Sequence, residues 1–557
     1  MNEKILANRL RYIVSFDYQT ESGFDSFCEM LAGHPLWRAG EPSRYEKDIY
    51  RYLVDAFMPN AQRTNVGCSF EIYTGKGKKK PEVFKMLYLP VGDKPVELTM
   101  KNAGLYLFRS GVGFFWYEVE LQKDEDNPRT GHNEPRVYTC EQLAVFQNTF
   151  KELNFDSYGT RPKQGSNAAP KNKIYRICEA GDEREGDWVE GEYRVREFSM
   201  GDWIASLLAG YLDPKDAPLM NWEVHFLPDR ENWAAGRMTG VHKDRVPDKA
   251  ILFSYVLTES AHAARATEED MTVQMPEFLK NIFCLTNGYT SKYRMPDGVY
   301  EECFRPFRNA FWYASRQGCG YFATEDESNV EFFRNNFPQK FAEDYFVLYI
   351  LLLYQSYTLL HWSAIIAQQL SADAADYRSG GVEVLEDLET TINVFLLKSV
   401  YTSVSHIQHQ NGFYDYVFKR LCIAEDIESV RTGMDYLNEM QKDIRQRQED
   451  AKKQEQERHK QLEDDRLNIV LGFLSLLAVF SALADGFAIS GELAEWGWQK
   501  LLPKTLTAHE LSVGVFWFVV VIAVLVLLVL GGAIRSYRKN RRKMKGEKRK
   551  NDHDNAG

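Results

Sequence analysis

The chain has 557 residues, a formal net charge of −11, 44% hydrophobic residues and 13% aromatic residues. This composition excludes a disordered protein, because a chain of this length and hydrophobicity can bury the cores of two or three domains. The acidic balance argues against direct nucleic-acid binding, which depends on basic surfaces. Eight cysteines without a CxxC pair are typical of reduced thiols in a cytosolic protein.

Residues 1–335 predict a cytosolic α+β domain, which we interpret as a sensor. Short runs rich in β-branched and aromatic residues alternate with helical patterns, such as the one over 140–153. The clearest hairpin is GLYLFRSGVGFFWYEVEL, in which two strands meet across residues 110–113. A second turn is expected at 318–320. A change from basic to acidic composition over 159–190 indicates a seam in this domain.

Residues 336–424 predict a helical cytosolic segment with one ambiguous run. Residues 346–367 carry no charge over a length that suits either a third membrane span or a buried core helix. Polar and aromatic side chains such as Tyr354 and His361 lower the hydropathy of this run, and acidic rather than basic residues precede it. We therefore expect a core helix.

Residues 425–466 predict a charged stalk helix, because they contain no proline and a single glycine, Gly433. Residues spaced alternately by three and four positions form a stripe along this helix, and the stripe is apolar in the first half of the helix and polar in the second. Such a stripe is typical of a coiled coil, and here it continues into the following hydrophobic segment without a helix breaker. The residues on the stripe are Ile427, Val430, Met434, Leu437, Gln441, Ile444, Gln448, Ala451, Glu455, Arg458, Leu462 and Asp465.

The last part of the chain predicts a transmembrane hairpin. Residues 467–489 and 511–534 are the two spans, and the first reaches roughly 35 Å at ~1.5 Å per residue, which is enough to cross a bilayer. Residues 490–510 form an extracytoplasmic loop, and residues 535–557 form a basic tail that is expected to stay cytoplasmic and contact anionic lipid. Two spans place both termini in the cytoplasm of a multi-pass inner (cell) membrane protein.

The first span carries small and polar residues on one face, which favours either close helix packing or a surface that faces water. Because a single hairpin cannot enclose water, a pore requires several copies of the chain. We expect a pore, with its mouth in the residues that follow. The predicted pore-lining residues are Asp465, Asn468, Gly472, Ser475, Val479 and Ala482, and the predicted mouth and loop residues are Asp485, Gly486, Glu492 and Glu495.

A second pattern suits a phosphate-bearing ligand. In FRPFRNAFWYASRQG, Arg305, Arg308 and Arg316 interleave with aromatic residues, and guanidinium groups bind phosphate well. Trp312 is the ring expected to stack on a base. An ordinary strand with surface arginines produces the same pattern, so both interpretations stay open. The histidines of the HIQH run at 406–409 lack a third metal ligand, and the identity of any bound metal is left unknown.

This layout resembles the CorA family of divalent-cation channels, which join a cytosolic α+β domain through a long helix to a two-span hairpin with a basic tail. The resemblance covers about 425–550. Family members carry Gly-Met-Asn at the outer end of the first span, followed by an acidic loop. Here Gly486 and Glu492 fit this pattern, whereas Phe487 and Ala488 stand in place of Met and Asn. The resemblance implies a homo-pentamer and a divalent cation such as Mg²⁺.

A divergent filter joined to a large cytosolic region resembles the CorA-like membrane effectors of type III CRISPR and related antiviral systems, which are thought to respond to a nucleotide messenger. We therefore expect an oligomeric ion channel that permeabilises the membrane in antiviral defence when its cytosolic domain binds such a messenger. The alternatives are a magnesium or divalent-cation transporter and a membrane-tethered receptor or scaffold without a pore. No P-loop, dinucleotide fingerprint, nucleophile elbow or HExxH motif occurs, so no enzymatic activity is expected.

Overall fold

The computed structural model divides the chain into two compact units, Met1–Ile444 and Arg445–Gly557. Each unit is described by itself below. The residues that the structure describes are 3–20, 23–34, 36–40, 48–50, 53, 66–72, 84–89, 95–119, 121, 138–153, 173–177, 187–189, 193–197, 200–208, 222–226, 249–259, 276–325, 331–371, 381–497, 517, 521, 524, 528, 531, 532 and 535.

The first unit is built on a mixed sheet of 14 strands among the described residues. The order is β12-β13-β14-β11-β1-β6-β5-β4-β7-β9-β8; β10 also pairs with β1, β3 with β5, and β2 with β3. β11 and β14 run parallel, and the other described pairs are antiparallel. The strands are β1 (Ile5–Thr20), β2 (Trp37–Ala39), β3 (Gly67–Ile72), β4 (Phe84–Leu89), β5 (Val96–Phe108), β6 (Val112–Val119), β7 (Lys173–Ile177), β8 (Asp187–Val189), β9 (Tyr193–Glu197), β10 (Trp222–Phe226), β11 (Ile251–Thr258), β12 (Phe304–Phe307), β13 (Ala310–Ser315) and β14 (Gly318–Thr324).

Helices cover the sheet, and the last of them leaves it for the second unit. This architecture confirms the expected sheet domain followed by long helices. The helices are α1 (Phe24–Ala32), α3 (Cys140–Lys151), α4 (Met200–Leu208), α6 (Pro276–Asn287), α7 (Val299–Glu302), α8 (Phe337–Lys340), α9 (Phe346–Ser371), α10 (Gly381–Ser399), α11 (Gln408–Arg420) and α12 (Ile423–Gly497), with two π-helical turns, η5 (Phe332–Asn336) and η6 (Phe341–Tyr345).

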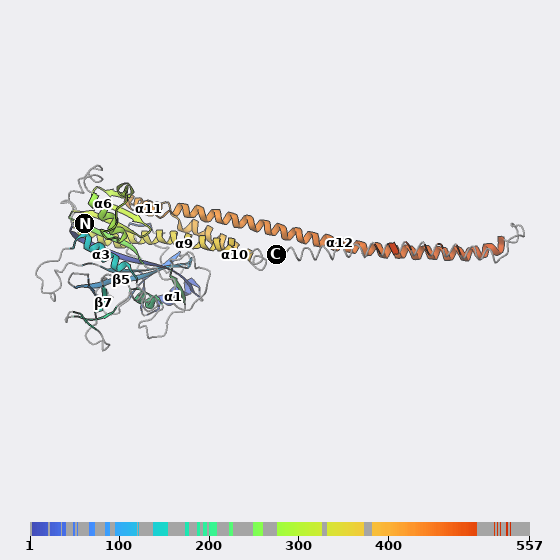
Figure 1. The fold of residues 1–557 in the computed structure, drawn as a ribbon, viewed down its shortest axis with the longest axis horizontal. Helices are drawn as coiled ribbons and strands as arrows, with labels where there is room; N and C mark the ends of the chain where they lie inside the picture. Colours follow the sequence, from blue (N-terminus) through green and yellow to red (C-terminus); the bar gives the residue numbers. More distant parts are fainter. Residues whose placement is uncertain are drawn as a thin grey trace. The chain divides into compact units, whose positions relative to one another are not determined.

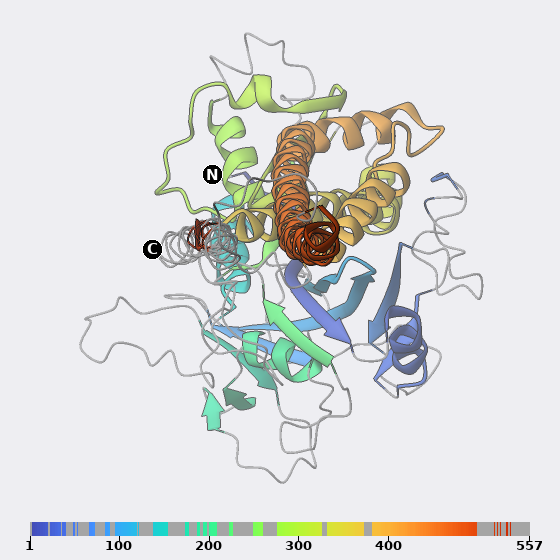
Figure 2. The same ribbon diagram turned by 90° about the vertical axis from the view of Figure 1, so that its right-hand side faces the viewer.

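Alternate residues of the sheet enter two hydrophobic cores, one on each face. On β1, Tyr12 and Val14 lie in the core that contains α1, α3, α4 and α6, whereas Ile13 lies in the core that contains α9, α10 and α11. On β13, Phe311 and Trp312 divide in the same way. This period of two follows from strand geometry, in which successive side chains point to opposite faces. The sheet is therefore buried on both faces, as Figures 1 and 2 allow the reader to follow.

The predicted β5–β6 hairpin is confirmed, whereas the turn predicted at 318–320 is wrong, because these residues belong to β14. Gly111 closes the β5–β6 hairpin with φ +85, a left-handed conformation that favours glycine. In the β13–β14 hairpin the turn lies at residues 316–317, not at 318–320. Gly318 is the first residue of β14 and pairs with Ser315. A side chain does not fit at this position, because a Cβ would lie 2.5 Å from the carbonyl oxygen of Thr286 on α6. The glycine that suggested a turn is needed for close packing between α6 and the sheet.

The uncharged run at 346–367 is a core helix, as predicted. The helical stretch Phe332–Ala367 is long and apolar enough to cross a membrane, but 61% of its most apolar window is buried inside the protein. Tyr354 stacks on Phe108 of the sheet with 3.8 Å between ring centroids, and it contacts Phe395 of α10 edge to face. The sheet and α10 thus cover the surface that lipid would cover in a membrane span.

The first turns of α12 belong to the first unit. They pack in the core that contains α9, and Gly433 allows the close approach, because a Cβ there would lie 2.8 Å from Cγ2 of Ile366. The apolar residues in the first half of the predicted stalk helix thus pack against other parts of the same chain. Their interpretation as a coiled-coil seam between copies is wrong. The buried residues of this stripe are Val430, Met434 and Leu437.

Candidate functional site

Residues 467–482 of α12 form an apolar helix that no other described residue covers. Its large side chains are exposed on all sides: 58% for Leu467, 56% for Val470 and 56% for Phe473. The helical stretch Ile423–Ala482 is long and apolar enough to cross a membrane, and none of its most apolar window is buried. Contiguous apolar surface of this kind requires lipid or partner helices to cover it. Two described helices could therefore span a membrane by composition, and none of the other described residues covers this one.

The six predicted pore-lining residues all lie on α12. Steps of three and four residues place them along one side of a helix that turns about 100° per residue. Each is exposed in the single chain, and a Cβ at Gly472 would meet no other atom within 4 Å. A single copy of this helix encloses no water, so the role of these residues depends on the assembly. They are Asp465, Asn468, Gly472, Ser475, Val479 and Ala482.

The predicted mouth residues, Asp485, Gly486, Glu492 and Glu495, also lie on α12. The helix continues to Gly497, eight residues past the predicted end of the span at 489, so the expected loop begins later than 490. The reason is that 490–497 contains no proline and its backbone hydrogen bonding continues the helix. The rest of the loop, the second span at 511–534 and the tail at 535–557 lie outside the described residues, apart from the single positions given above.

The structure does not bring the four predicted ligand residues together. Trp312 is fully buried on the face that carries α9 and α11. Arg305 donates Nε to the carbonyl oxygen of Arg308 at 3.0 Å, and its guanidinium lies 4.9 Å from the ring of Phe311. Arg308 and Arg316 lie in the turns at opposite ends of the six-residue strand β13, about 20 Å apart at ~3.3 Å per residue. One small ligand cannot contact all four side chains.

The second histidine of the HIQH run has a hydrogen-bond partner within the protein. His409 shares a hydrogen bond of 2.6 Å with Tyr345 through its Nδ1 atom. Burial and the nearby Lys340 lower the pKa of His409, which favours its neutral form. Within the described part of the chain, no group of three or more His, Cys, Asp or Glu side chains is arranged to hold a metal ion.

A buried Arg–Glu–Arg cluster, which the sequence analysis missed, joins the sheet to the helices. Arg11 and Glu118 are cross-strand partners on β1 and β6, and Glu118 accepts hydrogen bonds of 2.7 Å from Nε of both Arg11 and Arg9. Burial alone would raise the pKa of Glu118, but the two guanidinium groups outweigh it and lower that pKa. The Arg11 guanidinium also lies 4.5 Å from the ring of Trp116 and 4.2 Å from that of Phe346 on α9.

Three donors from this face of the sheet bind main-chain carbonyl oxygens in the helical segment 332–345. That segment contains both π-helical turns, and a π turn displaces carbonyl oxygens from their α-helical partners. Arginine and tyrosine side chains satisfy carbonyl oxygens that the helix leaves accessible, which anchors the start of α9 on the sheet. The pairs are Arg9 Nη1 to Pro338 O, Arg11 Nη1 to Ala342 O and Tyr255 OH to Phe333 O.

A sequence signal for this junction exists. Arg9 and Arg11 alternate with Leu10 and Tyr12 on β1, so they share a face with Ile13, which is buried. Two arginine side chains on the face of a strand that points into the core need hydrogen-bond acceptors inside the protein. The acceptors come from a helix about 330 residues later, as the Arg9 to Pro338 bond shows, and no local pattern connects the two segments.

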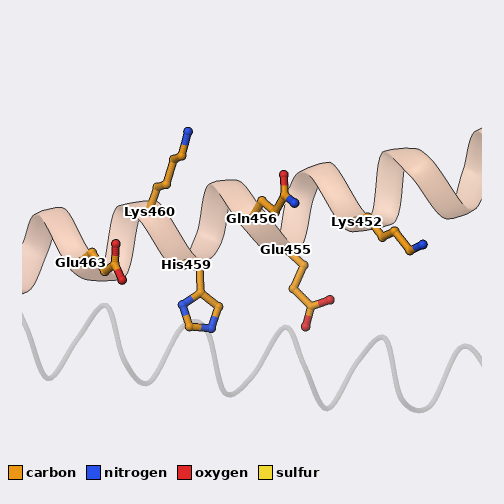
Figure 3. A pocket seen from close by; sticks show the side chains of 6 residues that line it. All are labelled: Lys452, Glu455, Gln456, His459, Lys460 and Glu463. Carbon is orange, nitrogen blue, oxygen red and sulfur yellow. The ribbon is translucent and has the colours of Figure 1, made fainter.

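In the second unit, six polar side chains of α12 line a shallow surface depression (Figure 3). Figure 3 shows Lys460 pointing away from the side on which Glu455 and His459 lie. Spacings of three and four residues allow attraction along the helix, at about 0.2–0.5 kcal/mol per pair. All six are exposed, and we assign them to solvation of the helix. They are Lys452, Glu455, Gln456, His459, Lys460 and Glu463.

The features that bear on function are thus an uncovered apolar helix and a polar junction that anchors the preceding helices on the sheet. Comparison with known proteins adds no family assignment, since no family model, curated protein or solved structure matches the chain. Functional argument therefore rests on the residues described above.

Proposed function

We propose that the chain is a multi-pass inner-membrane ion channel in which α12 from several copies lines a pore and the sheet unit gates it. The observation that carries this proposal is the exposed apolar segment 467–482 of α12. In a membrane, lipid covers most of this surface, and the face with Asn468 and Ser475 meets the same face of other copies around water. The second span, 511–534, completes the hairpin and keeps both termini cytoplasmic.

The proposed gating uses the continuity of α12. Its first turns pack against α9, and α9 is anchored on the sheet through Arg11, so a rearrangement of the sheet unit changes the position of the start of α12. An uninterrupted helix transmits rotation or axial displacement along its length. The junction before it is suited to such a change, because Cys422 adopts φ 60, a conformation that non-glycine residues rarely adopt.

The leading version is a CorA-like effector that a nucleotide messenger opens during antiviral defence. It draws on the resemblance in layout and on the divergence at Phe487 and Ala488. A second version, a magnesium or divalent-cation transporter, draws on the same layout. A third, a membrane-tethered receptor or scaffold, applies if the polar face of α12 is only a packing surface.

Ion flux through liposomes that contain the purified chain tests the pore. Ser475→Leu should abolish flux while insertion is unchanged, because an apolar constriction in a pore empties of water. Ser481→Leu is the matched control: it makes the same substitution on the same helix but off the predicted face, and it should conduct normally. Equal flux in both variants and the unmodified chain would assign the face to packing rather than to the pore lining, and no flux through the unmodified chain would remove the channel proposal.

A second flux series separates effector from transporter. Cyclic and linear oligonucleotide messengers are added at fixed Mg²⁺, and Mg²⁺ is then varied without nucleotide. An effector should show flux that rises with one messenger. A transporter should show basal flux that Mg²⁺ alone shuts off. Arg308→Ala and Arg316→Ala are tested separately, because the two residues lie in different turns, and a lost response in one variant locates the messenger at that turn.

A further inference from the structure

Four segments of the first unit meet at a small polar cluster on the helical side of the sheet. Residues 48–50 pair with the loop before α11: Ile49 forms a β-bridge with Ser405, and Tyr50 donates its N–H to Val404 O at 3.1 Å. Ser405 Oγ also donates to the carbonyl oxygen of Asp48. The other two segments are η6 and the first turn of α11.

Two carboxyl groups are close neighbours in this cluster. The side chain of Asp344 on η6, which is only 6% exposed, lies near enough to that of Asp48 for the two to share a hydrogen bond once one of them is protonated. Lys340 Nζ lies 2.9 Å from Asp48 Oδ2, and Gln410 Nε2 donates to Asp344 Oδ2 at 3.4 Å. Neighbouring carboxylates cannot both stay ionised at low cost, so a hydrogen bond between them needs a proton.

The two carboxyl groups divide into an acid and a base. Burial, then the charge of Asp48, raises the pKa of Asp344 to about 7, and the hydrogen bond from Lys340 outweighs burial and lowers the pKa of Asp48. The remaining titratable neighbours are Glu343 and Tyr345 on η6, His406 in the loop and His409 on α11.

We propose that Asp344 and Asp48 form a proton-binding site, in which one shared proton holds segment 48–50 and the start of α11 against the π-helical turn η6. Losing the proton places two negative charges side by side and releases the contact. The site lies where α9 and α11 begin, and α11 leads through Cys422 into α12, so the state of the site bears on these helices. This proposal does not depend on ion conduction.

The sign of the pH effect follows from linkage. Asp344 binds its proton more tightly in the closed contact, so closure is favoured at low pH and weakens as pH rises toward about 7. If the open contact restores an ordinary aspartate pKa, the opening constant rises about tenfold per pH unit between about pH 4 and 7 and levels off above. His409 acts with the opposite sign, because its pKa is lowered and its protonation opposes closure below about pH 6.5.

Hydrogen exchange of the full-length chain in detergent, corrected for intrinsic rates, tests the proposal. The unmodified chain should lose protection at amides 404–412 by about tenfold per pH unit between pH 5.5 and 7. Asp344→Asn keeps a hydrogen-bond donor toward Asp48 but cannot ionise. This variant should keep its protection as pH rises, because position 344 can no longer lose a proton.

Asp415→Asn is the matched control, because it removes an exposed carboxyl from the same helix α11. It should follow the profile of the unmodified chain. A flat profile in the unmodified chain, or an unchanged profile in Asp344→Asn, would overturn the proposal. Should Asp344→Asn fail to fold, infrared titration of the unmodified chain gives a second readout. A protonated carboxyl signal should vanish with a midpoint near pH 7 and shift to lower pH in Asp48→Asn, and its absence would also overturn the proposal.

Discussion

At the scale of single residues, the buried Arg–Glu–Arg cluster shows how charge supports a sheet whose two faces are both covered. Glu118 balances Arg9 and Arg11 through two short hydrogen bonds, and the arginines use their other donors on helix carbonyl oxygens. Such a cluster is not a large source of net stability, because desolvating the charges offsets their attraction. Its effect is to fix one position of the helical segment on the sheet.

Breaking this cluster should be costly. Glu118→Gln leaves the buried guanidinium group of Arg11 and the partly buried one of Arg9 without a balancing charge, which should lower the free energy of unfolding by about 3–5 kcal/mol. Thermal unfolding in detergent measures the change. Glu259→Gln removes a partner from an exposed pair with Lys4, at 4.0 Å, and should cost less than about 1 kcal/mol. Similar losses in both variants would mean that the buried cluster contributes no more than a surface pair.

The difference in stability between the unmodified chain and Glu118→Gln should also depend on pH. Because the pKa of Glu118 is lowered in the folded chain, its contribution to stability is present above its ordinary value of 4.5 and is lost as pH falls below that value. The stability gap between the unmodified chain and Glu118→Gln should therefore narrow between about pH 5 and 3. A gap that stays constant over this range would contradict the assignment of an ionised Glu118.

At the scale of elements, α12 changes its surroundings along its length. Its first turns are packed like any core helix, while residues 467–482 have no cover within the described chain. The packed part depends on Gly433, which lets α12 approach α9 at Ile366. The nearest atom of Ile366 is its Cγ2 methyl group, so a larger residue at position 433 can be accommodated if that methyl group is removed.

Gly433→Ala should therefore destabilise the first unit by about 1–3 kcal/mol, the usual range for overpacking. Combining it with Ile366→Leu, which removes the Cγ2 methyl group that lies 2.8 Å from the new Cβ, should recover part of the loss. The melting temperatures of the two single variants and the double variant measure the coupling. Strictly additive effects would show that the two residues are not in the predicted contact. Gly472→Ala is the control, since a Cβ at that position meets nothing within 4 Å in the chain.

At the scale of the whole molecule, the proposed channel requires several copies. The apolar residues of the stalk helix up to Leu437 are buried within the chain. Contacts between copies must therefore involve the polar residues later in the stalk helix. Ala451→Cys should therefore cross-link into dimers with a short bifunctional thiol-reactive reagent in membranes, because one cysteine per copy can join only two copies. Lys453→Cys points to the opposite side of the helix, about 200° away, and should cross-link poorly. Only monomers with both variants would remove the oligomeric channel.

Much of the fold follows from sequence patterns because its signals are local. The β5–β6 hairpin, the helix over 140–153 and the uncharged segment of α12 depend on alternation, turn residues and helical spacing within a few turns of chain. The same helical spacing predicts that the six pore-lining residues from Asp465 to Ala482 share one face of the helix. The existence of a long helix with an apolar segment is thus a property of the sequence by itself.

The tertiary structure decided which of these patterns meet a partner. The apolar runs at 346–367 and 467–482 have similar composition, yet the first is buried against the sheet and the second is not. Likewise, Trp312 and Arg308 are near in sequence but separated by the alternation of β13 and its turn. The bond from Arg9 to Pro338 and the pairing of Asp48 with Asp344 join residues far apart along the chain. Burial and pKa depend on such distant neighbours, so only the folded chain determines them.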